Sequence, residues 1–104
     1  MSKELLAAVV AKLDAMIEAT PLPPAADDPD AVLDAFAVVA RDRAALIAEL
    51  AVLAGPVSRE PEVLERHAQL TARDQSWMGA LQRAQILVGE RIGSVRRTVR
   101  AYAR

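Results

Sequence analysis

The sequence contains no cysteine, which excludes disulfide bonds, thiolate catalysis and sulfur-ligated zinc, and its single histidine argues against a His-dependent triad. Four glycines and 3% aromatic residues supply neither a phosphate-binding loop nor a β-sandwich. No uncharged apolar stretch approaches the ~20 residues of a membrane span. The 13 basic side chains nearly balance the 14 acidic ones, so no strong field draws the 104-residue chain to nucleic acid or lipid. We therefore expect no catalytic residue, metal or cofactor.

The N-terminal residues lack the basic-then-apolar order of a signal peptide, because Glu4 follows Lys3 directly. This pattern favours a cytoplasmic protein. Together with the missing catalytic residue types, it predicts a protein that is not an enzyme.

Helix-forming residues dominate the chain, and their spacing predicts an all-α antiparallel three-helix bundle in a single domain. Ser2 is placed to cap the first helix, and Asp28 followed by Pro29 is a favourable start for the second. Gly55 and Pro56 form a stop signal after it. The predicted elements are a helix over 3–19, a proline-rich connector over 20–29, a helix over 29–54 and a helix over 59–103.

Apolar residues recur four and three residues apart along the second and third helices, the spacing of a face that packs in a bundle. Trp77 and Met78 are predicted core anchors. His67 is predicted to be packed or partly exposed rather than to bind metal, since Val63 and Thr71 occupy the neighbouring turns. The second-helix seam is Val32, Phe36, Val39, Arg43, Leu46, Leu50 and Leu53, beside an alanine-rich seam of Leu33, Ala37, Ala40, Ala44, Ile47 and Ala51. The third-helix seam is Val63, His67, Leu70, Asp74, Trp77, Leu81, Ala84, Val88, Arg91, Val95, Thr98 and Tyr102.

The third helix is predicted to be much longer than the second, roughly 60 Å against about 38 Å. If the two form a hairpin, the segment after Ala84 has nothing in the monomer to pack against. Either it bends near 89–93, at Gly89 or Gly93, into a short fourth helix, or a partner covers it. The candidate partner-binding residues are Leu87, Val88, Ile92, Val95, Val99 and Tyr102.

Two charged residues, Arg43 and Asp74, interrupt opposite apolar seams at levels that a hairpin brings within one turn of each other. We predict a partly buried ion pair that sets the register of the second and third helices. A catalytic role for Asp74 is disfavoured because no second carboxylate converges on it.

Charge is unevenly distributed along the chain. Residues 1–34 hold two lysines against seven acids, whereas residues 83–104 hold six arginines against Glu90 alone. The preferred interpretation is a basic amphipathic helix shaped for an acidic or amphipathic partner helix. Contact with nucleic acid through phosphates is an alternative, although the chain has no recognisable nucleic-acid-binding motif.

Several spaced motifs carry a family resemblance over most of residues 28–104. They are Asp30-x-x-Leu33, Arg43-x-x-Leu46-Ile47-x-x-Leu50, Leu70-x-x-x-Asp74-x-x-Trp77-x-x-x-Leu81 and the terminal Ala101-Tyr102-Ala103-Arg104. In their order and in total length these resemble the FlgN/FliT-type flagellar export chaperones. The chain lacks the asparagine-rich stretch of the FlgN branch, so the FliT-like side is favoured.

The resemblance implies a helical bundle that holds the C-terminal helical segment of a hook-associated or filament-cap subunit and delivers it to the export apparatus. It assigns Tyr102 to contact with the export gate and residues 90–103 to a last helix that can cover the client site. The short first helix and the proline-rich connector depart from the family pattern. Two other functions stay open: a structural homo-oligomeric bundle, in which the tails of a homodimer pair, and a nucleic-acid accessory protein using the arginine-rich tail.

Overall fold

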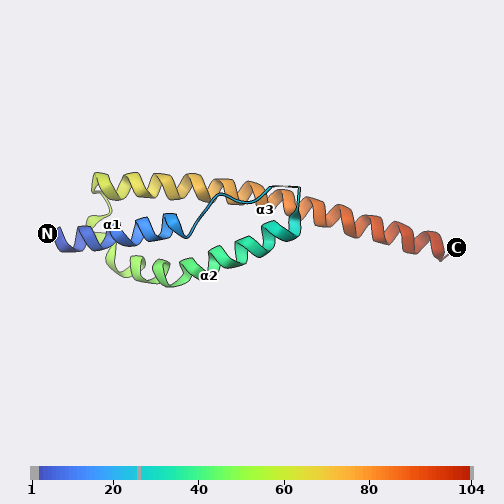
Figure 1. The fold of residues 1–104 in the computed structure, drawn as a ribbon, viewed down its shortest axis with the longest axis horizontal. Coiled ribbons are helices and arrows are strands. Elements are labelled where there is room, and N and C mark those ends of the chain that lie inside the picture. Colours follow the sequence, from blue (N-terminus) through green and yellow to red (C-terminus); the bar gives the residue numbers. More distant parts are fainter. Residues whose placement is uncertain (1–2, 26, 104) are drawn as a thin grey trace.

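The computed structural model describes residues 3–25 and 27–103, and it confirms the all-α three-helix architecture (Figure 1). The elements are α1 (Lys3–Glu18), α2 (Pro29–Leu53), the 3₁₀ turn η1 (Gly55–Val57) and α3 (Pro61–Tyr102). Helices α1 and α3 run in one direction and α2 runs in the other. The described part is a rod with extents of 73 × 20 × 17 Å. The predicted cap Ser2 lies outside the described residues, as does Arg104.

Helix α2 begins and ends at the signals expected from the sequence. The Asp28 carboxylate accepts a hydrogen bond from the Ala31 amide at 3.1 Å, and Pro29 occupies the first turn. Its C-terminal cap is Ala54, and the chain then passes through η1 with no positive φ at any described glycine. Gly55 therefore ends α2 within a tight right-handed turn rather than in a left-handed conformation.

The core divides into two clusters along the rod, because α1 has only 16 residues and covers only one half of it. Beyond the end of α1, α2 packs directly on α3, and the Phe36 and Trp77 rings lie 6.0 Å apart. The first cluster contains Val9, Leu13, Met16, Leu50, Val57, Val63 and Leu70. The second contains Val32, Val39, Trp77, Ala80 and Ala84.

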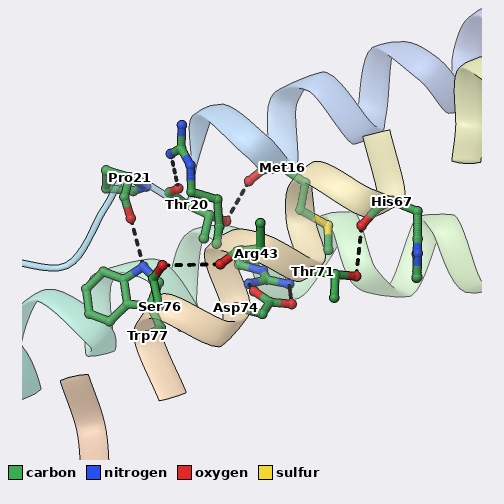
Figure 2. Close-up of polar contacts among 11 residues, drawn as sticks. Met16, Thr20, Pro21, Arg43, His67, Thr71, Asp74, Ser76 and Trp77 are labelled. Carbon is green, nitrogen blue, oxygen red and sulfur yellow. Dashed lines mark hydrogen bonds and ion pairs between the residues drawn. The ribbon is translucent and has the colours of Figure 1, made fainter. Parts of the chain in front are cut away.

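The proline-rich connector is anchored to α3 by side chains of α3 itself (Figure 2). Arg73 donates to the Thr20 carbonyl oxygen and Trp77 Nε1 donates to the Pro21 carbonyl oxygen, both at 2.7 Å. Thr20 is fully buried, and its hydroxyl donates to the Met16 carbonyl oxygen. These bonds satisfy backbone groups that the prolines leave outside any helix, and they hold the connector against the bundle.

Helix α3 is unbroken over 42 residues and extends well past the start of α2 (Figure 1). Gly89 and Gly93 lie inside this helix, so the alternative in which one of them bends the chain into a fourth helix is wrong. Residues 90–103 consequently do not fold back over the bundle. The region from Gly89 to Ala103 is called the tail below.

Candidate functional site

Two adjacent apolar stripes run along α3, and they differ in what covers them. The first, called the inner stripe, faces α1 and α2, and every one of its members is buried or half-buried. It comprises Val63, Arg66, Leu70, Arg73, Trp77, Ala80, Ala84 and Leu87.

The second stripe, called the outer stripe, lies one residue further along the helix and is exposed except at Leu81 and Val88, which are half-buried. Apart from Ile86, every exposed large apolar side chain of α3 belongs to it. It comprises Leu64, His67, Thr71, Asp74, Met78, Leu81, Gln85, Val88, Ile92, Val95, Val99 and Tyr102. The spacing of three and four residues is unbroken from the hairpin to the end of the tail, as in a coiled-coil seam.

The predicted partner-binding residues divide into two groups in the structure. Ile92, Val95, Val99 and Tyr102 lie on the outer stripe and are 48%, 59%, 60% and 88% exposed. Leu87 belongs to the inner stripe and is half-buried, as is Val88, so the bundle itself partly covers these two. The uncovered apolar face of the tail therefore consists of four side chains.

A shallow depression marks the base of this face, where the tail leaves the bundle. It holds about 330 Å³ and is formed by Leu33 of α2 with Leu81, Gln85 and Val88 of α3. Leu33 belongs to the alanine-rich seam of α2, and all six residues of that seam are exposed. One residue of the α2 seam, Leu33, thus meets the outer stripe at this depression.

A larger groove of about 520 Å³ opens between α2 and α3 near the hairpin. Its lining is almost entirely apolar and includes α1 residues. The lining residues are Leu13, Met16, Ile47, Leu50, Ala51, Ala54, Ser58, Val63, Leu64, His67 and Leu70. No sequence pattern indicates this groove directly, although Ile47 and Ala51 of the alanine-rich seam line it.

The ion pair between Arg43 and Asp74 forms as expected (Figure 2). Arg43 Nη1 lies 2.6 Å from Asp74 Oδ1 and Nη2 lies 3.5 Å from Oδ2. The arginine side chain is 16% exposed and the aspartate 47%, and the buried Arg43 Nε has no hydrogen-bond partner. The pair joins α2 to α3 at this level of the bundle.

Two further ion pairs attach α1 to the hairpin. Lys12 pairs with Glu49 of α2, and Arg66 of α3 donates to Asp14 at 3.1 Å. Each contact joins two helices, and Lys12 and Glu49 also line a shallow depression of about 400 Å³ together with Ala48, Val52 and Leu53.

The predictions for single residues of the third helix have mixed outcomes. Trp77 is a core residue, only 3% exposed, as expected. Met78 is not, since 61% of it is exposed on the outer stripe. His67 is exposed at the edge of the larger groove, with Thr71 donating to its carbonyl oxygen at 2.9 Å. The error at Met78 arises because neighbouring residues on a helix point 100° apart, so only one of the two can face the bundle.

The tail carries a concentration of positive charge. Among the residues that the structure describes, Arg96, Arg97 and Arg100 form no ion pair, while Arg91 lies 3.5 Å from Asp30 of α2. Glu90 is the only acid in the tail. The exposed apolar side chains of the tail are therefore flanked by positively charged residues.

Within residues 3–25 and 27–103, no group of three or more His, Asp or Glu side chains is placed to hold a metal ion. No helix in this part is long and apolar enough to cross a membrane. Comparison of the chain with protein-family models, with curated proteins and with solved structures finds no match. Inferences about function therefore depend on the sequence motifs and the surfaces of the chain itself.

Proposed function

We propose that the protein is a non-enzymatic cytoplasmic chaperone or adaptor that holds an amphipathic helix of a flagellar or related secreted subunit before export. The observation that carries this proposal is the uncovered apolar face of the tail, formed by Ile92, Val95, Val99 and Tyr102. An exposed stripe with spacing of three and four residues is complementary to a helix that buries residues at the same spacing.

The shape of the bundle supports binding of a helix rather than of a small molecule. The tail projects beyond the rest of the molecule, so a partner can lie along it without displacing α1 or α2 (Figure 1). At its base the partner meets the depression beside Leu33 and Val88. A contiguous exposed apolar surface with a polar rim is typical of a protein-interaction site.

The flagellar part of the proposal depends on the resemblance to FlgN/FliT-type chaperones. That resemblance supplies the class of client, a hook-associated or filament-cap subunit, and a role for Tyr102 at the export gate. Tyr102 is 88% exposed near the described end of α3, which leaves it accessible to a partner.

The test is binding of purified chain to the C-terminal helical segments of hook-associated and filament-cap subunits from the same organism. We expect one segment to bind, and we expect Val99→Asp to abolish binding because a carboxylate would replace an apolar contact. Arg97→Asp is the matched control, since Arg97 is exposed and lies two residues from both Val95 and Val99, on the opposite side of the helix. Equal loss with both variants, or binding of no segment, would contradict the proposal.

A further inference from the structure

The charges beside the apolar face of the tail all have one sign. On a helix, a residue directly before or after a stripe position lies on the shoulder of the stripe, about 100° around the axis. Arg91 precedes Ile92, Arg96 follows Val95 and Arg100 follows Val99. The remaining shoulder positions in the tail hold uncharged residues, namely Gly89, Gly93, Ser94, Thr98, Ala101 and Ala103.

The other two charged residues of the tail lie on its far side. Glu90 is two residues from both Val88 and Ile92, and Arg97 is two residues from both Val95 and Val99. A separation of two residues places side chains on opposite sides of a helix. The single acid of the tail is therefore directed away from anything that packs on the outer stripe.

We propose that the partner of this face is an amphipathic helix of another protein whose shoulders are acidic. This inference rests on the proposed function and adds the chemistry of the client. Carboxylates on the client's shoulders would meet Arg96 and Arg100, which form no ion pair within the described chain. Charge complementarity of this kind selects partners and orients them on the surface.

The same charges argue against a second copy of the chain as the occupant. The tail carries four arginines against one glutamate within residues 89–103. When two such tails pair face to face, the shoulders of both are basic, whether the helices run parallel or antiparallel. Like charges placed opposite each other disfavour that pairing.

The length of the exposed part of the stripe sets the size of the client helix. From the depression at Leu81 to Tyr102 the stripe covers about 32 Å of helix, which corresponds to a partner helix of about 21 residues. A suitable probe is therefore a fluorescein-labelled amphipathic peptide of that length, with leucines at stripe positions and glutamates at shoulder positions. A second peptide with lysines in place of the glutamates serves as its counterpart.

The experiment measures binding of both peptides to the full chain by fluorescence anisotropy at low salt. We expect the glutamate peptide to bind at least about tenfold more tightly than the lysine peptide, and the difference to shrink as salt is added. Arg96→Glu should weaken binding of the glutamate peptide by about tenfold, because an attractive pair becomes a repulsive one. Arg97→Glu is the matched control, with the same charge change on the far side of the helix, and should weaken it less than about twofold.

Each other outcome overturns the inference in a distinguishable way. If both peptides bind equally, the tail binds helices without regard to charge, and the proposed function stands while the acidic client does not. If neither binds, the proposed function fails with it. A short DNA duplex whose binding is weakened equally by Arg96→Glu and Arg97→Glu would assign the tail to nucleic acid. A dimer in light scattering that Val99→Asp converts to a monomer, with neither peptide binding, would assign the face to a second copy.

Discussion

Trp77 on α3 and Pro21 in the connector are joined by a hydrogen bond of 2.7 Å between the indole Nε1 and the proline carbonyl oxygen. This bond, together with that from Arg73 one turn earlier, allows a connector rich in proline to lie closely against a helix. Trp77 is thus both a core residue and a clamp for the segment between α1 and α2.

Replacing Trp77 with phenylalanine keeps most of the buried ring and removes the donor. We expect Trp77→Phe to lower the free energy of unfolding by about 1–2 kcal/mol, because the Pro21 carbonyl loses its partner in a partly buried place. Urea denaturation followed by circular dichroism measures the change. The exposed neighbour provides the control: Met78→Ala should change the free energy by less than about 0.5 kcal/mol. Equal effects of the two substitutions would show that the clamp contributes nothing.

The Arg43–Asp74 pair should contribute a measurable coupling between α2 and α3. A double-mutant cycle with Arg43→Met and Asp74→Asn is expected to give a coupling of about 1 kcal/mol, reduced by added salt, since the aspartate is nearly half exposed. Arg41→Met is a useful comparison because Arg41 pairs only with its exposed neighbour Asp42. Additive single effects of Arg43→Met and Asp74→Asn would argue against a register-setting pair.

The glycines of α3 allow the stability of the tail to be separated from that of the bundle. Apart from the adjacent residues and the backbone of the helix itself, no atom lies within 4 Å of a Cβ added at Gly79 or Gly89, and neither has a positive φ. Replacing either glycine with alanine should therefore stabilise the helical conformation by about 1 kcal/mol. We expect Gly79→Ala to raise the global free energy of unfolding. Gly89→Ala should chiefly slow amide hydrogen exchange within the tail, because we expect a helical segment with exposed side chains to open independently of the core. A global gain from both variants would show that the tail unfolds together with the bundle.

Tyr102 offers a test of the proposed role in export. Because its side chain is 88% exposed, Tyr102→Ala should leave the free energy of unfolding unchanged within about 0.5 kcal/mol. In a flagellated host that carries the chain, the same substitution should reduce export of the client subunit while the client still binds the purified chaperone. Unchanged export of every flagellar subunit would contradict the proposed contact between Tyr102 and the export gate.

The fold followed closely from sequence patterns because the strongest signals were local. Asp28 with Pro29 marked the start of α2, and the length difference between the helices indicated that α1 and α2 cannot cover the end of a straight α3. The missed features depend on contacts between distant segments. The bonds from Arg73 and Trp77 to the connector join residues more than fifty positions apart, and no local pattern indicates them.

The interpretation of α3 as having one seam was the main error in the sequence-based picture. A seam that steps four and three residues can start at either of two neighbouring residues, and the predicted one alternated between the two real stripes. Leu70 and Trp77 belong to the inner stripe, whereas His67 and Asp74 belong to the outer one. Only packing against α1 and α2 decides which stripe is covered, so the larger groove beside Ile47 and Leu64 could not be predicted from spacing alone.

The most direct test of the tail as the binding surface is a residue-by-residue map of where the glutamate-shouldered peptide binds. Such a map is obtained by titrating the isotope-labelled full chain with this peptide and recording the amide chemical shifts. We predict that the largest shifts occur at Ile92, Val95 and Val99 and extend to the depression beside Leu81. Shifts confined to the larger groove, at Ile47, Leu64 and His67, would contradict the assignment and place the partner at the other end of the molecule.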